Sequence, residues 1–425
     1  MNICELAKAL GASAEGGENI EITGLCASAA KVQRGDLFFC YKGRSFDSHE
    51  VAARAVRGGA AALVCERKLD LPVPQLIVGD GRAAMTAAAR EFYGRPDRRL
   101  KMVGVTGTNG KTTVTYMLDS IFRAAGRSTG VIGTLGIAFA GRAIAPELTT
   151  PDPICLFSVL REMADCGVEY VFMEVSAHAL AFGKTEGITF EAGIFTNCTQ
   201  DHLDFFADMN EYSGCKKKLF RGGRCLRSVI NSDDATGREI ARFAPAPVTY
   251  GLKNPADVFA VDIAERLDGS TFVINLFDEL YEIGLHMPGE YNVSNALAAA
   301  ACARVLGVKT EVIANGLAAL ERVPGRLECA GKYNGASIFV DFAHTPDGLG
   351  KSLGTLKRLC GGKLYCLFGC GGNRDSSKRP LMGAVAAKYA DFLIITSDNP
   401  RYEDPYDIIL QIEEGVRLPE SRMSR

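Results

Sequence analysis

The run GVTGTNGKTTV, Gly104–Val114, combines residue types whose spacing suits phosphate chemistry. It follows the apolar segment Met102–Val105 and precedes a helix-like segment, YMLDSIFRAAG. In a strand, glycine-rich loop and helix of this kind, backbone N–H groups surround a triphosphate, Lys111 reaches its β- and γ-phosphates, and the Thr112 hydroxyl holds Mg²⁺. Val105 stands where the strict form of the pattern has glycine, so this is a variant. The run predicts a nucleotide site, and a ligand-free glycine turn is the alternative.

Two further predicted strands end in side chains that suit a metal ion. YVFMEV places Glu174 at its far end, and TNCTQDHLDFF places His202 between Asp201 and Asp204. A carboxylate at the end of a buried strand is costly without a compensating cation, so beside a phosphate loop we favour metal ligation by Glu174 over helix capping or an ion pair. His202 fits a surface turn and a second metal site equally well, the latter with a carboxylate orienting its ring.

Three consecutive lysines, Lys216, Lys217 and Lys218, follow within MNEYSGCKKKLF. A run of like charges usually forms a solvated helix face. Alternatively, one lysine that is crowded by positive neighbours has a lowered pKa. Its neutral amine then adds CO₂ and becomes a carbamate, which is an anionic metal ligand. Residue types alone do not choose between these interpretations.

Composition excludes several classes of protein. Among 425 residues, the net charge is −2, so no basic field exists to attract nucleic acid or an anionic membrane. The sequence contains neither a signal-peptide segment near its start nor an apolar run long enough for a membrane span. Fourteen cysteines are scattered singly, which indicates reduced thiols and a cytoplasmic location. With 47% hydrophobic and 23% charged residues, the chain is expected to be globular.

The elements that position these motifs alternate between short apolar runs and helical segments. Such alternation predicts an α/β fold, with parallel sheets and crossover helices after residue 98. A charged, proline-containing stretch around residues 93–101 and the pair Pro324-Gly325 mark two joints. We therefore expect domains at residues 1–97, 98–323 and 324–425. In open α/β sheets ligands bind beyond the carboxyl ends of strands, which is where the motifs stand. The predicted strands include residues 35–43, 170–175, 192–197, 337–344, 363–372 and 391–400.

The motifs also occur in a diagnostic order: GVTGTNGKTT, ELTTPDP, MEVSAHAL, FTNCTQDHLDFF, PGEYNVSNALAA, VPGRLE, VDFAHTPDGL, FGCGGNRDSSKRPLMG and SDNPRYEDP. In these motifs the sequence resembles the Mur ligases, from Gly35 to about Glu414. The resemblance implies three domains: an N-terminal domain that binds UDP-MurNAc, a central P-loop ATPase domain and a Rossmann-like C-terminal domain. It also implies a reaction in which ATP converts a carboxylate into an acyl phosphate and an amine attacks, which gives an amide, ADP and phosphate.

Within the family the sequence resembles members that add meso-2,6-diaminopimelate to UDP-MurNAc-L-Ala-D-Glu in peptidoglycan precursor synthesis. Diaminopimelate differs from lysine by a carboxylate, and Asp398-Asn399-Pro400-Arg401 resembles the motif of diaminopimelate-adding members. A guanidinium matches that extra carboxylate. The resemblance assigns Arg374, Asp398, Asn399, Pro400 and Arg401 to diaminopimelate. We expect a monomer whose partners are these substrates and ATP.

The resemblance also implies roles for the remaining motif residues. The catalytic set is Lys111, Glu174, His202 and Lys216. The Mg²⁺ ligands are Thr112, Glu174, His202 and a CO₂ carbamate on Lys216. Among the three lysines, Lys216 has the spacing from Tyr212 and to Phe220 that the carbamylated lysine has in the family. The residues that correspond to ATP-binding positions are Gly107, Thr108, Asn109, Gly110, Lys111, Thr112, Thr113, Asn292, Asn295, Arg326, Asp341 and His344. The UDP-MurNAc-dipeptide positions are Ser28, Thr149, Thr150, Ser176 and Lys184.

Several positions depart from the family pattern. Ser28-Ala29-Ala30 stands where members usually have Asp-Ser-Arg, and Lys184 replaces an arginine expected near the dipeptide's glutamate. The sequence ends at RLPESRMSR without the Gly-x-Gly-His-Glu segment that binds the amino end of diaminopimelate, so we expect an incomplete last domain. The alternatives are a lysine-adding homologue, a nucleotide-binding protein that forms no amide, and a folylpolyglutamate-type ligase.

Overall fold

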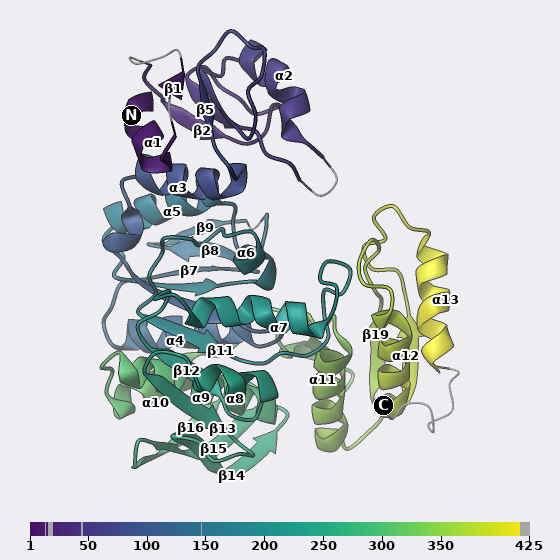
Figure 1. The fold of residues 1–425 in the computed structure, drawn as a ribbon. Coiled ribbons are helices and arrows are strands. Elements are labelled where there is room, and N and C mark those ends of the chain that lie inside the picture. Colours follow the sequence, from purple (N-terminus) through teal and green to yellow (C-terminus); the bar gives the residue numbers. More distant parts are fainter. Residues whose placement is uncertain (13, 16–19, 44–45, 146, 417–425) are drawn as a thin grey trace. The chain divides into compact units, whose positions relative to one another are not determined.

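The computed structural model describes the chain except for residues 13, 16–19, 44–45, 146 and 417–425 (Figure 1). The chain divides into two compact units. The first consists of Met1–Met102 and Ser128–Phe190, and the second of Val103–Arg127 and Glu191–Arg425. Each unit is therefore assembled from segments that are distant in the sequence.

The first part of unit 1 is a small α/β layer. Its sheet has the strand order β1-β5-β4-β3-β2, in which β2 to β5 are parallel and β1 is antiparallel to β5. The buried strands are short apolar runs, which suits a sheet whose faces are covered. Its elements are α1 (Ile3–Leu10), β1 (Ala14–Glu15), β2 (Gly24–Cys26), β3 (Asp36–Phe39), η1 (Ser48–Val51), α2 (Ala52–Arg57), β4 (Ala62–Cys65), β5 (Gln75–Ile77), α3 (Gly81–Phe92) and η2 (Pro96–Arg98).

The second part of unit 1 carries the strand that ends in Glu174. Strand β10 (Tyr170–Glu174) is parallel to β7 (Thr129–Gly133), so the carboxyl ends of both strands lie at one edge. The antiparallel strands β8 (Gly136–Phe139) and β9 (Arg142–Ile144) continue from β7. Helix α5 (Pro153–Asp165) precedes β10, and α6 (Ala177–Ala181) follows it.

Unit 2 contains the phosphate-loop strand. Here the strand order is β16-β15-β14-β13-β12-β11-β6. Strands β6, β11, β12, β13 and β14 are parallel, and β14, β15 and β16 form an antiparallel meander. The elements up to the second joint are β6 (Lys101–Thr106), α4 (Lys111–Ala124), β11 (Ala192–Phe195), α7 (Met209–Lys217), η3 (Lys218–Phe220), β12 (Ser228–Asn231), α8 (Ala235–Ala241), β13 (Pro247–Gly251), β14 (Val258–Arg266), β15 (Gly269–Leu276), β16 (Glu279–Leu285), α9 (Glu290–Val305) and α10 (Thr310–Ala319).

Helix α9 is the centre of this part. Its segment from residue 295 to 303 is buried on every side, and most of its residues are alanine. A helix that is apolar all round belongs inside a core, and small side chains let the neighbouring strands and α4 approach closely. The first two turns of α9 carry Asn292 and Asn295, which are both buried.

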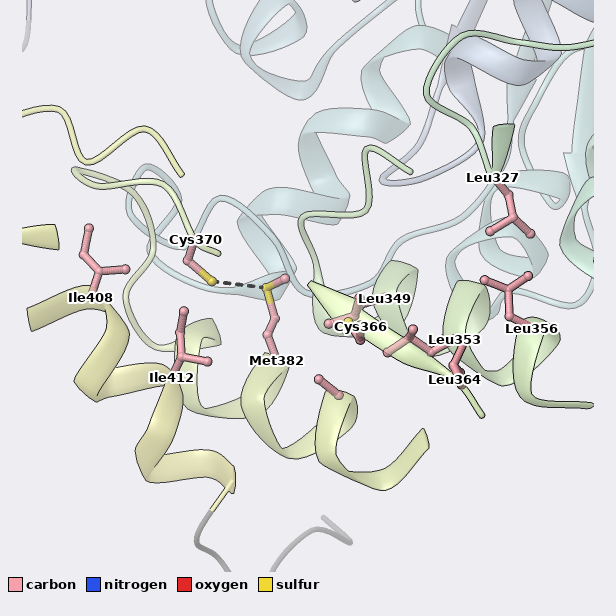
Figure 2. Close-up of a cluster of buried hydrophobic side chains, with 11 residues drawn as sticks. Leu327, Leu349, Leu353, Leu356, Leu364, Cys366, Cys370, Met382, Ile408 and Ile412 are labelled. Atoms are coloured by element: carbon pink, nitrogen blue, oxygen red, sulfur yellow. Dashed lines mark hydrogen bonds between the residues drawn. The ribbon is translucent and has the colours of Figure 1, made fainter. Parts of the chain in front are cut away.

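The last part of unit 2 has its own apolar core (Figures 1 and 2). Leucines of α11 (Pro346–Leu359), Cys366 of β19 (Tyr365–Phe368), Met382 of α12 (Lys378–Tyr389) and isoleucines of α13 (Pro405–Val416) pack together. Strand β19 is parallel to β20 (Phe392–Ile395), so the loops after both strands emerge at one edge. Strands β17 (Glu328–Tyr333) and β18 (Ala336–Val340) form an antiparallel hairpin at the start of this part.

The predicted α/β class is confirmed, and each predicted strand overlaps an observed one. The expectation of parallel sheets throughout the later blocks is wrong for β7 to β9, for β14 to β16 and for β17 with β18, which pair antiparallel. The hairpin between β17 and β18 turns at Asn334-Gly335, where both residues have positive φ angles of 47° and 80°. Asn-Gly is a strong signal for such a turn, because both residues tolerate this backbone conformation. The stretch at residues 93–101 includes the buried Asp97, which pairs with Arg90, so it packs as part of unit 1.

Two observations concern the environment of the chain. In the part that the structure describes, no helix combines the length and apolarity needed to cross a bilayer. All fourteen cysteines lie in this part and are free thiols.

Gly316 provides a test of the packing in unit 2. A Cβ atom at Gly316 in α10 would lie 2.4 Å from the Cα of Ile121 in α4, so the two backbones are nearly in contact. We expect Gly316→Ala to lower the free energy of unfolding by about 1–3 kcal/mol through overpacking. Urea unfolding followed by circular dichroism measures this. The matched control is Gly214→Ala in α7, where a Cβ meets nothing within 4 Å; its stability should stay equal or rise by up to about 1 kcal/mol. Equal stability of both variants contradicts the close packing.

Candidate active site

The phosphate loop lies between β6 and α4, and close packing explains its glycines. A Cβ at Gly110 would lie 2.4 Å from Oδ1 of Asn295, and one at Gly107 would lie 1.9 Å from Oγ1 of Thr196. Gly110 also has a φ of 88° and forms the N-cap of α4. Only glycine fits both positions, and the loop leads directly to the positive end of a helix.

The segment after β11 holds this loop in place. Strand β11 runs parallel to β6, so residues 196–199 emerge beside residues 107–110. The Thr108 N–H donates to the carbonyl of Asn197 at 2.9 Å, and the Asn109 N–H donates to Oδ1 of Asn197 at 2.9 Å. The Thr196 hydroxyl donates to the carbonyl of Asn109 at 2.6 Å. The sequence analysis did not single out Thr196 and Asn197; their place after a parallel strand was the available signal.

Lys111 and Thr112 begin α4. The Nζ of Lys111 donates to the carbonyls of Gly107 at 2.9 Å and Thr108 at 2.8 Å, so its ammonium lies at the loop. The buried Thr112 hydroxyl accepts a hydrogen bond of 2.8 Å from Nη2 of Arg326. Arg326 follows the second joint in sequence, and the fold brings it to the phosphate loop.

A cavity of about 740 Å³ adjoins the loop. The predicted nucleotide residues that line it are Asn109, Gly110, Thr113, Asn292, Asn295, Arg326, Asp341 and His344. Its further lining residues, which the sequence analysis missed, include Tyr250, Leu252, Tyr291, Asp347, Lys351 and Arg358. Aromatic and apolar groups together with amides, carboxylates and cations suit a nucleotide, which has an apolar base and a charged tail.

Asp341 and the two asparagines are rigid parts of this cavity. The Asp341 carboxylate accepts from the backbone N–H groups of Leu327 and Ala343, both at 2.7 Å. Burial raises the pKa of Asp341, although these hydrogen bonds oppose the shift. Nδ2 of Asn295 donates to Oδ1 of Asn292 at 3.3 Å, and Nδ2 of Asn292 donates to the carbonyl of Pro288 at 2.8 Å.

The structure separates the three consecutive lysines. Lys216 is completely buried, and its Nζ lies 3.0 Å from the ring centroid of Tyr212. Within the described residues this Nζ has no hydrogen-bond partner. Lys217 pairs with Glu239 at 2.5 Å, and Lys218 is exposed.

Burial is the main cause that lowers the pKa of Lys216 to about 7, and the positive Lys111 contributes. Crowding by the neighbouring lysines, the cause considered from the sequence, is therefore not the cause found. The Tyr212 hydroxyl is 3.1 Å from Oγ1 of Thr108, so α7 is connected to the phosphate loop.

Asp201 is a buried carboxylate beside two histidines and a lysine. It lies 3.2 Å from Nε2 of His202, 3.4 Å from Nε2 of His344 and 3.4 Å from Nζ of Lys378. Burial by itself raises the pKa of Asp201, but the hydrogen bond to His344 and the surrounding positive charges hold it well below its usual range. Asp201 therefore orients the ring of His202 and also joins the central part of unit 2 to its last part. The exposed Asp204 has no such role.

Glu174 lies in unit 1, in a pocket of hydroxyl groups. Its side chain is buried, and it accepts from the backbone N–H of Thr134 at 2.8 Å and from the hydroxyl of Thr134 at 3.1 Å. The Thr134 hydroxyl is also 3.2 Å from that of Thr149. A Cβ at Gly133 would lie 2.2 Å from Oε1 of Glu174, so the strand end needs glycine.

The residues assigned to the dipeptide surround the same strand end. The Thr150 hydroxyl donates to the carbonyl of Glu174 at 2.8 Å and accepts from the N–H of Ser176 at 3.1 Å. Nζ of Lys184 lies 3.3 Å from the carbonyl of Thr150 and pairs with Asp152 at 2.6 Å. Ser28, by contrast, is exposed in a turn after β2.

The residues assigned to diaminopimelate occupy two loops, after β19 and after β20. Nη1 of Arg401 donates to the carbonyl of Gly372 at 2.6 Å, and the N–H of Gly372 donates to the carbonyl of Asn399 at 2.9 Å. Arg379, which is fully buried, pairs with Glu403 at 2.8 Å and holds both loops together. Asp398, Arg401 and Arg374 are exposed, as expected for groups that receive a ligand.

The acidic, histidine and cysteine side chains of the described residues do not form a metal site by themselves. Within the described part of the chain, no three His, Cys, Asp or Glu side chains form a group that could hold a metal ion. The Nζ of Lys216 is buried, has no hydrogen-bond partner within the described residues and has a lowered pKa, which is the chemistry that carbamate formation requires. The oxygen ligands of Thr112 and Glu174 suit Mg²⁺.

Comparisons with known proteins cover nearly the whole chain. The family model for the Mur ligase middle domain matches residues 105–303, and the model for the glutamate ligase domain of Mur ligases matches residues 325–423. Residues 304–324 lie between the two matches.

Two relatives and one solved structure that resemble this chain have the name UDP-N-acetylmuramoyl-L-alanyl-D-glutamate–2,6-diaminopimelate ligase. The relative from Geobacillus kaustophilus is 44% identical over 94% of this chain and 83% of the relative. The relative from Bacillus cereus is 41% identical with the same coverage, 94% and 83%. A solved structure with this name has a TM-score of 0.74 and 28% identity, and the match covers 96% of this chain and 85% of that one.

The Asp201 cluster predicts a stability effect. We expect Asp201→Asn to lower the free energy of unfolding by about 1–3 kcal/mol, because the amide leaves His202, His344 and Lys378 without their shared negative charge. Urea titration measures this, and Asp204→Asn is the matched control because Asp204 is exposed. Equal midpoints for both variants contradict the role that the geometry gives to Asp201.

Proposed function

The chain belongs to the Mur ligase family, and we propose that it is the ATP-dependent ligase that joins meso-2,6-diaminopimelate to UDP-MurNAc-L-Ala-D-Glu. The proposal rests on the cavity that adjoins the phosphate loop. It is supported by relatives that have the name of this ligase and match 94% of the chain. The reaction contributes to peptidoglycan precursor synthesis, with ATP, the UDP-linked dipeptide and diaminopimelate as partners. A cytoplasmic monomer without affinity for nucleic acid or membranes remains our expectation.

The chemistry follows from the poor reactivity of a carboxylate towards amines. An oxygen of the dipeptide's glutamyl carboxylate attacks the γ-phosphorus of ATP, and ADP leaves. The neutral amine of diaminopimelate then attacks the carbonyl carbon of the acyl phosphate. Phosphate leaves with the electron pair of the broken C–O bond, and the nitrogen loses a proton to give the amide. Lys111 and the N-terminus of α4 stabilise the negative charge on the transferred phosphoryl group.

Mg²⁺ would neutralise phosphate charge when bound. Thr112, Glu174, His202 and carbamylated Lys216 are the residues that we propose to hold it. Lys216 suits the modification because its amine is buried and has a pKa lowered to about 7, so a large neutral fraction exists at physiological pH. Lys217 and Lys218 lack this environment.

The substrate groups are bound by residues that the fold already orients. Thr149, Thr150, Ser176 and Lys184 are proposed to hold the dipeptide, with Ser28 near the nucleotide end. Arg374 and Arg401 are proposed to bind diaminopimelate carboxylates, with Asp398, Asn399 and Pro400 shaping the loop. Arg401 donates to Gly372 through Nη1 only, which leaves other N–H groups of its guanidinium for a carboxylate.

Phosphate release tests this function. With ATP, Mg²⁺, bicarbonate and UDP-MurNAc-L-Ala-D-Glu, we expect release to rise at least about 10-fold more with meso-diaminopimelate than with L-lysine, because Arg401 pairs with the extra carboxylate. Arg401→Lys should reduce this preference, since lysine lacks the bidentate geometry. Arg95→Lys, a charge-conserving change in unit 1, is the control. Equal rates with both amino acids favour a lysine-adding homologue or an unselective enzyme, and ATP binding without release favours a protein that forms no amide.

Lys216 gives an independent prediction. We expect Lys216→Ala to reduce kcat at least about 100-fold, because a metal ligand is lost, and short carboxylates such as acetate to restore part of the activity. ¹³C NMR of the wild type with ¹³C-bicarbonate should show a carbamate signal that Lys216→Ala lacks. Lys217→Ala should keep both the signal and the rate. A carbamate signal that persists in Lys216→Ala assigns the modification elsewhere and contradicts the proposal.

A further inference from the structure

Arg82 occupies an unusual place in unit 1. It lies in the first turn of α3, where Asp80 caps the helix by accepting from the Arg82 N–H at 2.9 Å. Its guanidinium carbon is 4.6 Å from the ring centroid of Tyr41 and 4.4 Å from that of Phe182. A planar cation is therefore held between two aromatic rings that come from distant parts of the sequence.

No carboxylate of the described residues neutralises this cation. Among the described residues, the Arg82 side chain forms no hydrogen bond or ion pair, and it is only half-buried. The nearby Glu66 accepts instead from the backbone N–H groups of Gly81 at 3.0 Å and Lys42 at 3.2 Å. Arg90 on the same helix shows the contrast, since it pairs with Asp97 at 2.8 Å. The guanidinium carbon lies over both rings, and within the described residues the N–H groups of the guanidinium have no acceptor.

The surroundings of Arg82 connect it to the residues proposed for the dipeptide. Phe182 ends α6, whose N-cap is Ser176, and Lys184 follows two residues later. The Thr86 hydroxyl, one helical turn beyond Arg82, donates to the carbonyl of Gly183 at 3.2 Å, so α3 is bonded to this segment.

Tyr41 also connects Arg82 to the residues proposed for the dipeptide. Burial raises the pKa of Tyr41, and the charges of Arg82 and Asp152 act on its hydroxyl in opposite directions. Asp152 is therefore near Tyr41, and Asp152 is the partner of Lys184. Because Lys184 is already paired, Arg82 is the cation near the dipeptide residues that has no acidic partner within the described residues.

We propose that Arg82 binds an oxyanion of the nucleotide-sugar peptide substrate through its N–H edge, while Tyr41 and Phe182 fix the plane of its guanidinium. This inference rests on the proposed function, which makes the substrate a UDP-linked, carboxylate-bearing peptide. Two groups of that substrate have the required chemistry, the diphosphate and the dipeptide carboxylates. A rigid, stacked guanidinium binds either with two parallel hydrogen bonds and loses little entropy.

Isothermal titration of UDP-MurNAc-L-Ala-D-Glu into the full chain tests the inference. We expect Arg82→Gln to weaken binding roughly 10- to 100-fold, the usual range for a hydrogen-bonded charge pair. Arg82→Lys should lie between, because it keeps the charge without the planar fork. The matched control is Arg57→Gln, an exposed arginine on α2, which should bind like the wild type. The KM for ATP should stay within about two-fold of the wild type in every variant.

UDP-GlcNAc distinguishes the two sources, since it carries the diphosphate without a carboxylate. If Arg82 binds the diphosphate, Arg82→Gln weakens UDP-GlcNAc by the same factor as the full substrate. If Arg82 binds a dipeptide carboxylate, UDP-GlcNAc binding is unchanged while binding of the full substrate is weakened. Both outcomes support the inference.

Two outcomes overturn it. Unchanged binding of the full substrate by Arg82→Gln shows that the stacked guanidinium does not contact it. Weakened binding that extends equally to ATP and accompanies a large loss of thermal stability shows that Arg82 only joins Tyr41 to Phe182. If the wild type itself does not bind UDP-MurNAc-L-Ala-D-Glu, the proposed function is wrong, and the inference that rests on it is wrong as well.

Discussion

The close approach of the phosphate loop to its neighbours is the constraint on which the rest of unit 2 depends. Residues 107–110 pack so tightly against Thr196 and Asn295 that a side chain has no room at Gly107 or Gly110. Parallel pairing of β6 with β11 creates the first contact, and the buried helix α9 creates the second. The loop conformation is thus determined by two elements that lie far from it in sequence. Hydrogen bonds from the Thr108 and Asn109 N–H groups to Asn197 also fix the loop backbone, and a rigid loop loses little entropy when it binds a ligand.

Burial then gives chemically similar groups different properties. Lys216, Lys217 and Lys218 have the same side chain, yet only Lys216 is removed from water beneath Tyr212. Desolvation disfavours its charged form, whereas the other two keep contact with solvent or a carboxylate. Asp201 shows the opposite case, since a buried carboxylate among cations keeps its charge.

The sequence predicted the fold well wherever the signal was local. Apolar runs bounded by glycine and polar residues identified the strands, and alternation with helical segments identified the α/β class. The direction of β14 to β16 and of β18 was predicted wrongly, because alternation was extended across segments that are joined by tight turns. The Asn334-Gly335 turn was a local signal for a hairpin, but the meander of β14 to β16 depends on cross-strand packing that no single segment shows.

The sequence by itself determined the ordered motifs, and through them the phosphate loop, the family and the residue types available for chemistry, because these depend on residue identity and spacing along the chain. Only the tertiary structure decided which of those residues are buried, paired or free to bind. It connected Arg326 to Thr112, Lys378 to Asp201, and Arg82 to Tyr41 and Phe182. The reason is physical: pKa values, ion pairs and stacking depend on distances and dielectric surroundings, which arise when distant segments pack together.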